Sequence, residues 1–140
     1  MKNKLRNSIR IICMYLCTLL YLLLLSGCSQ SETITETNYM QITAKEAKNI
    51  MDHETDYIIL DVRTEEEFSE GHIDGAILIP DYEIADKAEK ILTDKDQLIL
   101  VYCRSGRRSK LAADSLVTMG YTNIKEFGGI IDWPYDVVTK

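Results

Sequence analysis

The chain contains 140 residues, enough for one domain at the roughly 100–200 residues that a domain usually takes. Its composition, 46% hydrophobic and 27% charged with 7 Gly and 2 Pro, excludes collagen-like and intrinsically disordered chains. The 4 cysteines are too few for a dense disulfide scaffold. A net charge of -6 argues against a general nucleic-acid binder, because such proteins neutralise phosphates with clustered Lys and Arg.

The N-terminal segment has the features of an export signal. Four basic residues, Lys2, Lys4, Arg6 and Arg10, precede an apolar run from Ile11 to Leu25. That run has 15 residues, fewer than the roughly 20 that span a bilayer as a helix. It ends in Leu-Ser-Gly-Cys at 25–28, which resembles the signal of bacterial lipoproteins, whose cysteine is lipidated and becomes the new N-terminus. An uncleaved N-terminal anchor is the alternative, and it would also hold the domain at the membrane.

The lipoprotein interpretation divides the chain into a signal peptide over 1–27, a polar tether over 28–38 and a folded domain over 39–137. It predicts an exported protein, attached through Cys28 to the outer face of the bacterial cytoplasmic membrane or facing the periplasm. The mature chain keeps 12 Lys and Arg against 22 Asp and Glu, a net charge of -10. Because Cys13 and Cys17 leave with the signal and Cys28 is acylated, Cys103 remains as the one free thiol.

From residue 39 onward, strand signals alternate with helix signals. A short strand over 39–42 precedes a capping box at Thr43–Glu46, which starts a helix that ends near Asp52. An apolar strand over 57–60 precedes a second capping box at Thr64–Glu67 and a short helix. A third strand is predicted over 76–79.

The second half of the domain continues this alternation. Apolar residues at helical spacing predict a helix that contains Ile84, Ala88, Ile91 and Leu92. The most apolar strand, 98–102, is expected at the centre of the sheet and is followed by a helix over 107–119. The inward side chains predicted for this helix are Leu111, Ala112, Ser115, Leu116 and Met119. A last strand over 123–127 leads through two glycines to a short helix that holds Trp133. The pattern predicts an α/β fold with a mostly parallel sheet and helices on both faces.

Cys103 follows the central strand, at the edge of the sheet where parallel α/β proteins bind ligands. The segment Arg-Ser-Gly-Arg-Arg-Ser at 104–109 joins this strand to its helix. Backbone amides just before a helix converge into an anion-binding nest, and the basic side chains nearby add positive charge. These side chains are Arg104, Arg107, Arg108 and Lys110. We therefore expect a lowered pKa for the Cys103 thiol; a buried structural cysteine beside a solvated basic surface is the alternative.

Short motifs occur in one order over most of the domain. They are Asp61-Val-Arg63, Glu66-Glu67-Phe68, Gly71-His72-Ile73, Gly75-Ala76-Ile77, Pro80, Val101-Tyr-Cys-Arg-Ser-Gly106, Ala112-Ala113, Gly120-Tyr121, Gly128-Gly129-Ile130 and Trp133. Together they resemble the single-domain rhodaneses, a family of sulfurtransferases with a five-stranded parallel sheet. The resemblance implies that Cys103 carries a persulfide and that Arg104, Ser105, Gly106, Arg107 and Arg108 cradle it and bind substrate. Sulfane sulfur would pass from thiosulfate or a persulfide donor to a thiophilic acceptor.

Other matched residues are predicted to support the structure. Asp61 and Arg63 are expected to fix the loop and the strand ends, His72 to hold a turn, and Trp133 to lie in the core or a lid. His53 is expected in solvent. We expect no cofactor, metal or nucleic acid; the expected partners are a small anionic sulfur donor, a thiol or cyanide acceptor and the membrane, with the domain as a monomer.

Two alternative functions remain. Related cysteine phosphatases and arsenate reductases have a loop one residue longer, which places an arginine six positions after the cysteine. That position is Ser109 here, and Arg108 comes five positions after Cys103. The second alternative is a non-catalytic rhodanese-like module that docks a partner or carries sulfur without turnover.

Overall fold

The computed structural model describes residues 38–139. The predicted signal peptide, Cys28 and the tether as far as residue 37 lie outside the described residues. The strands are β1 (Met40–Gln41), β2 (Tyr57–Asp61), β3 (Ile77–Leu78), β4 (Leu98–Cys103) and β5 (Ile124–Gly129). The helices are α2 (Ala44–His53), α3 (Glu65–Glu70), α4 (Ile84–Ile91) and α5 (Arg107–Thr118), with 3-10 turns η1 (Asp81–Glu83) and η2 (Ile130–Asp132).

Two of the helices begin at the capping boxes that the sequence predicts. The Thr43 hydroxyl accepts a hydrogen bond from the Glu46 amide at 3.2 Å, and the Glu46 carboxylate accepts one from the Thr43 amide at 2.7 Å. Thr64 and Glu67 form the same reciprocal pair at the start of α3. Each box satisfies two amides that have no partner inside the helix, so the local sequence fixes where α2 and α3 start.

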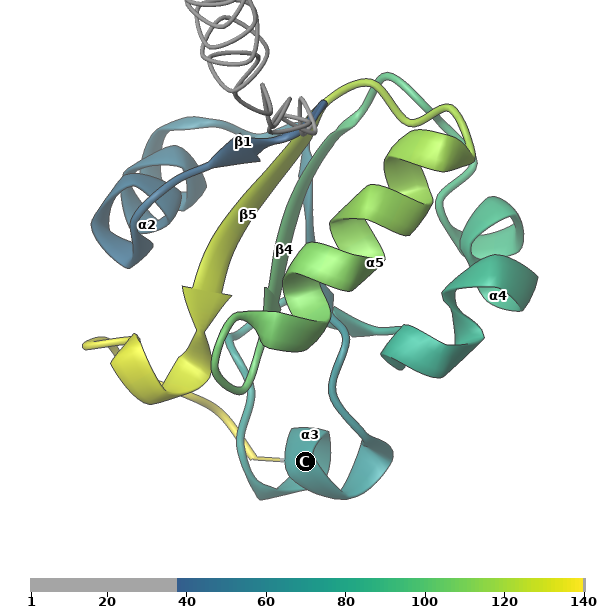
Figure 1. Cartoon of the computed structure of the whole chain (residues 1–140). Helices are drawn as coiled ribbons and strands as arrows, with labels where there is room; N and C mark the ends of the chain where they lie inside the picture. The colour runs from purple at the N-terminus through teal and green to yellow at the C-terminus, as the bar shows by residue number, and fades with distance from the viewer. Residues whose placement is uncertain (1–37, 140) are drawn as a thin grey trace, which may run out of the picture. The chain divides into compact units, whose positions relative to one another are not determined.

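The five strands form one parallel sheet in the order β1-β5-β4-β2-β3, and β4 lies at its centre (Figure 1). This confirms the predicted α/β fold and the central position of the most apolar strand. All the strands end at one edge of the sheet, which therefore gathers the loops that follow β2, β3 and β4. Within residues 38–139, no helix combines the length and the apolar character needed to cross a bilayer.

Side chains of β4 alternate between two cores. Ile99, Val101 and Cys103 pack on the face that α4 and α5 cover, together with Leu60, Ala112 and Leu116. Leu100 and Tyr102 pack on the opposite face against α2, with Ala47, Phe127 and Trp133. The period of two along a strand requires this division, and it explains why β4 has almost no polar residue.

The buried face of α5 differs from the prediction. Leu111 is 54% exposed and Ser115 is exposed, whereas Ser109, Ala112 and Ala113 are buried with Leu116. The small side chains of Ala112 and Ala113 pack against the sheet, and the larger Leu111 points away from it. The helix is therefore turned by about one residue from the orientation that its apolar side chains suggest. Ile91, part of the apolar pattern that predicts α4, is also 45% exposed.

Candidate active site

Cys103 lies at the carboxyl end of β4, and its side chain is fully buried at the floor of the following loop. The Gly106 amide donates a hydrogen bond to its Sγ atom at 3.1 Å. Gly106 has φ of +92° and directly precedes α5, so the chain reverses here and directs its amides back at the sulfur. The sequence prediction of an amide nest around Cys103 agrees with this geometry.

Two opposing effects act on the Cys103 thiol. Burial acts to raise its pKa, but the polar groups of the loop outweigh it: the amides of Ser109, Ser105 and Gly106 face the sulfur, and the Ser109 hydroxyl lies beside it. The net result is a Cys103 pKa below the ordinary value. The nucleophilic form, the thiolate, is thus favoured at the end of the central strand.

A glycine in the neighbouring strand allows the loop to take this shape. The register between β4 and β5 slips by one residue, because Val101 pairs with Glu126 but Cys103 pairs with Gly129. A Cβ atom at Gly129 would lie 2.3 Å from the carbonyl oxygen of Arg104 and 2.5 Å from the Cα of Ser105. Only a residue without a side chain can lie beneath the loop at this position, which explains why Gly129 is found there.

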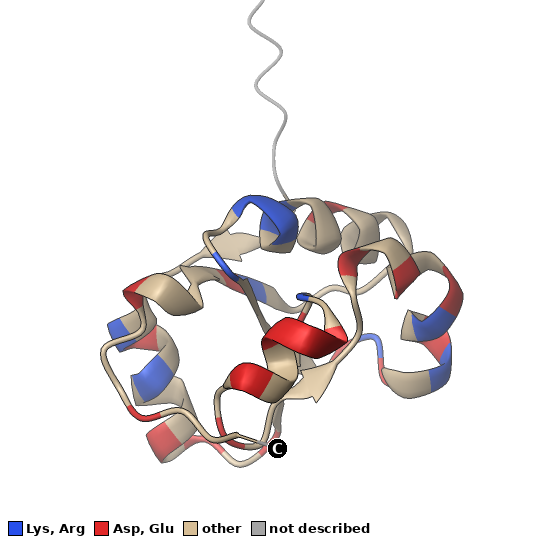
Figure 2. Ribbon diagram, turned by 90° about the horizontal axis from the view of Figure 1, so that it is seen from below, with Lys and Arg blue, Asp and Glu red and all other residues tan. Residues whose placement is uncertain are grey.

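The arginines of the loop differ in their surroundings. Arg104 and Arg107 are exposed, while Arg108 donates two hydrogen bonds to the Glu67 carboxylate, at 2.8 and 2.7 Å. This bidentate pair links α5 to α3, which Figure 2 shows to be mostly acidic. The Arg108 hydrogen bonds are the main cause that lowers the pKa of Glu67 to about 2. Much of the Arg108 charge is therefore compensated inside the domain.

Asp61 and Arg63 form a buried ion pair at the end of β2. The Arg63 Nε and Nη2 atoms donate to both carboxylate oxygens, and Nη2 also donates to the Gly71 carbonyl at 2.6 Å. Both residues are at most 5% exposed. The pair ties the end of β2 to the turn after α3, one strand away from Cys103, and it does not touch the sulfur.

The histidines and Trp133 occupy structural positions. His72 is buried, stacks on Phe68 at 3.7 Å between ring centroids and shares a hydrogen bond between its Nδ1 and the Phe68 carbonyl. His53 is exposed at the end of α2. Trp133 follows η2 and lies in the core beside Phe127. In the part of the chain that the structure describes, no group of three metal-ligating side chains occurs.

Three residues that contact the loop or lie in it, Glu67, Ser109 and Glu126, are absent from the site predicted from the sequence. Glu67 pairs with Arg108, and the buried Glu126 of β5 accepts a hydrogen bond from Ser109 at 2.6 Å. Glu126 could have been found from the strand period, since it lies on the same face as Ile124, which faces the core. No local signal predicts the Glu67–Arg108 contact, because 41 residues separate the partners.

Residues 43–134 of the chain match the family profile described as "Rhodanese-like domain". The thiosulfate sulfurtransferase PspE of Escherichia coli is 38% identical over 73 residues, which cover 52% of this chain and 70% of PspE. The adenylyltransferase and sulfurtransferase UBA4 of Candida albicans is 36% identical over 107 residues, 71% of this chain but only 24% of that protein.

Solved structures share the fold over most of the described residues. A rhodanese-related protein from Thermoplasma volcanium has 30% identity and a TM-score of 0.64, and the match covers 73% of this chain and all of that one. A rhodanese with anions from E. coli has 34% identity and a TM-score of 0.57, with 60% and 99% covered.

Proposed function

Because the chain belongs to the rhodanese-like domain family, we propose that it transfers sulfane sulfur through a persulfide on Cys103. Relatives that are named sulfurtransferases support sulfur transfer in general. The donor that we propose is thiosulfate or a persulfide, and the acceptor is a thiol or cyanide. Arg104, Ser105, Gly106 and Arg107 would bind the donor.

One observation carries the proposal: the Cys103 sulfur is fully buried, yet several hydrogen-bond donors converge on it and lower its pKa. A structural cysteine in an apolar core behaves as a small hydrophobe, and burial without donors raises its pKa. Backbone amides of Ser105, Gly106 and Ser109 that converge on one sulfur are an arrangement suited to an anion. The same donors can hold a thiolate first and the terminal sulfur of a persulfide afterwards.

The reaction divides into two nucleophilic displacements. The Cys103 thiolate attacks the outer sulfur of thiosulfate, the S–S bond of the donor breaks, and sulfite leaves with the bonding electrons. The acceptor then attacks the terminal sulfur of the Cys103 persulfide, and the Cys103 thiolate leaves. With cyanide as acceptor the product is thiocyanate. Such covalent catalysis predicts ping-pong kinetics.

Intact mass spectrometry tests the proposal directly. The domain mixed with thiosulfate should gain about 32 Da, the mass of one sulfur atom, and should lose it when cyanide is added and thiocyanate appears. Cys103→Ser should fold as the native protein does, because the change replaces one buried sulfur by oxygen, but should gain no mass and show no transferase activity. If the wild-type mass stays constant with every sulfane donor while Cys103 is reduced and reacts with an alkylating agent, the non-catalytic docking module takes the place of this proposal.

A further inference from the structure

Glu126 is a buried carboxylate directly behind the Cys103 loop. It lies in β5 and is only 2% exposed. Within residues 38–139, two other carboxylates near the loop have a cationic partner, Asp61 with Arg63 and Glu67 with Arg108, whereas Glu126 forms no ion pair. Burying a carboxylate without a cation costs folding free energy, so the hydrogen bonds that Glu126 makes indicate what it does in the fold.

The Glu126 carboxylate joins the two segments that enclose Cys103. Its Oε1 atom accepts one hydrogen bond from the Ser109 hydroxyl at 2.6 Å and one from the Gly128 amide at 2.9 Å. Ser109 is the third residue of α5, and Gly128 lies where the register of β5 slips beside Cys103. Glu126 therefore fixes the start of α5 against the strand beneath the loop.

The Ser109 hydroxyl has one hydrogen and several acceptors. It lies within reach of the Cys103 sulfur, of the Gly106 carbonyl at 3.0 Å and of Glu126 Oε1 at 2.6 Å. A short bond to a carboxylate is the strongest of these, because a charged acceptor strengthens a hydrogen bond. The hydrogen then points at Glu126, and the sulfur keeps the amides of Ser105, Gly106 and Ser109 as its donors.

We propose that Glu126 is a positioning residue for Cys103, which acts through Ser109 to limit how strongly the loop stabilises the thiolate. It does so by taking the Ser109 hydrogen and by placing a negative charge behind the sulfur. The proposal rests on the proposed function in one respect, namely that Cys103 is the nucleophile. The consequence is chemical: a thiolate that is stabilised too strongly attacks more slowly, with a Brønsted slope of about 0.4–0.5.

The other buried or half-buried charged groups near Cys103 are paired with opposite charges, so they cannot weaken the stabilisation of the thiolate as Glu126 can. Arg108 of α5 acts on the thiol, and its charge is matched by Glu67 of α3. Asp61 and Arg63, at the end of β2, neutralise each other. On the β1 side, burial raises the pKa of Tyr39, and the negative charges of Asp114 and Glu126 raise it further. Glu126 is thus the buried charge near the sulfur that no cation balances among the described residues.

The test is the pH dependence of Cys103 alkylation by iodoacetamide in the folded protein. Glu126→Gln keeps the size and an acceptor oxygen but removes the charge. The midpoint of the alkylation profile should fall by at least about one pH unit, because a charge about 4 Å away at an effective dielectric of about 20 is worth roughly three units and a more distant one less. At high pH, where the thiolate is complete in both proteins, the variant should react about threefold more slowly.

Two further variants make the outcome specific. Glu89→Gln removes an exposed carboxylate far from the loop and should leave the profile unchanged. Ser109→Ala should change the midpoint little, because the hydroxyl hydrogen is already donated to Glu126. A midpoint that rises by about one pH unit would show that the hydroxyl donates to the Cys103 sulfur instead, and would overturn the proposal. The Ser109→Ala result also stands alone if Glu126→Gln does not fold.

An unchanged midpoint in folded Glu126→Gln would equally overturn the positioning role. A purely structural role would lower the thermal unfolding temperature of Glu126→Gln without moving the alkylation midpoint. Alkylation needs only a thiol and no sulfur donor, so this test and the persulfide test fail independently of each other.

Discussion

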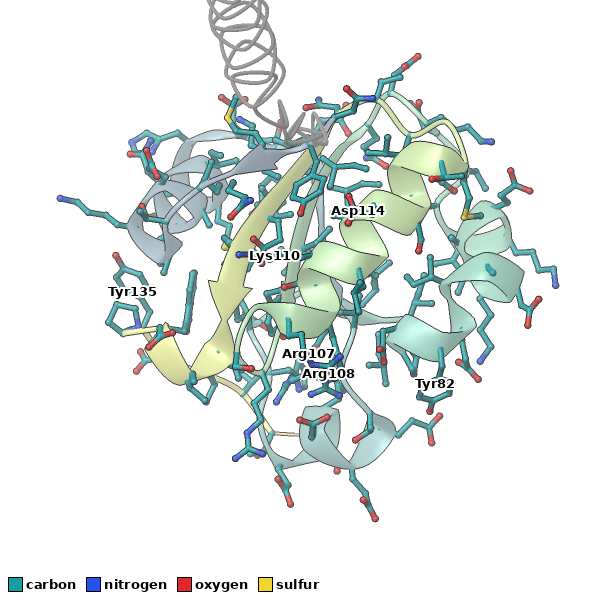
Figure 3. The ribbon with its side chains drawn as sticks, viewed as in Figure 1. Tyr82, Arg107, Arg108, Lys110, Asp114 and Tyr135 are labelled. Carbon is teal, nitrogen blue, oxygen red and sulfur yellow. The ribbon has the colours of Figure 1, made fainter. Side chains whose placement is uncertain are left out.

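At the scale of single residues, neighbouring arginines of the loop have different uses. Arg107 is exposed, whereas the Arg108 guanidinium is held by Glu67 on both hydrogen-bonding sides. In Figure 3 the two side chains lie at the start of α5, and Lys110 lies apart from them, towards the middle of the helix. Arg107, with Arg104, is therefore the charge that can attract an anionic donor to a domain that is acidic as a whole.

We predict that Arg107→Gln raises the KM for thiosulfate about threefold and changes kcat less, because an exposed cation acts mainly on the approach of the anion. The dependence of kcat/KM on salt should also flatten, since the screening length is only about 8 Å at physiological ionic strength. Lys110→Gln removes the same charge from the same helix and should leave both quantities as in wild type. Equal effects of the two changes would show that overall charge governs donor binding, and unchanged kinetics in Arg107→Gln would remove Arg107 from donor binding.

Which residues of the site can be predicted from the sequence depends on how far they lie from Cys103 along the chain. Cys103, Gly106 and the basic residues lie within one short loop, so their chemistry could be predicted without a structure. Glu126 and Glu67 reach the loop from another strand and another helix, and only folding brings them there. Arg108 is an example: the sequence predicts that its side chain binds the anionic substrate, but in the structure it pairs with Glu67.

At the scale of secondary-structure elements, local signals fixed the starts of helices better than their orientation. The capping boxes at Thr43 and Thr64 are complete within four residues, and both helices begin there. The rotation of α5 depends instead on what it packs against, because the small Ala112 and Ala113 face the sheet and the larger Leu111 faces solvent. Apolar character alone does not contain that information.

The contact between α3 and α5 should make stability depend on pH. Glu67 has a pKa of about 2 in the folded domain against 4.5 unperturbed, so its ionised form stabilises the fold above pH 4.5. We predict that Glu67→Gln costs about 1 kcal/mol at pH 7, as measured for good ion pairs at partly exposed sites. Glutamine can still complete the capping box with Thr64, so the loss reports on the Arg108 contact.

The measurement is urea unfolding of both proteins from pH 7 to pH 2. A carboxylate with a depressed pKa loses its contribution as it is protonated, so the difference between wild type and Glu67→Gln should shrink as the pH falls from about 4.5 towards 2. Glu66→Gln, in the same exposed first turn, serves as the matched control and should show little difference at any pH. A Glu67→Gln difference that persists at pH 2 would mean that the ion pair is not its source.

At the scale of the whole molecule, the position of the acidic domain in the cell depends on residues outside the structure. We propose that the chain is exported and anchored through a lipidated Cys28, as its N-terminal sequence suggests. One acyl chain binds a membrane only marginally, so two or three chains on the cysteine would be needed for stable attachment. The polar tether over 28–38 would then separate the lipid from the start of β1.

Cys28→Ser tests this proposal, because it removes the sulfur to which lipid would attach and leaves the apolar run of the signal intact. We expect the variant to incorporate no labelled fatty acid, and either to remain as the longer precursor or to be released from the membrane fraction. Cys17→Ser, within the apolar run, is the matched control and should still be processed and lipidated. A Cys28→Ser protein that is shortened and retained in the membrane like wild type would exclude lipid attachment at Cys28 and favour another form of anchor.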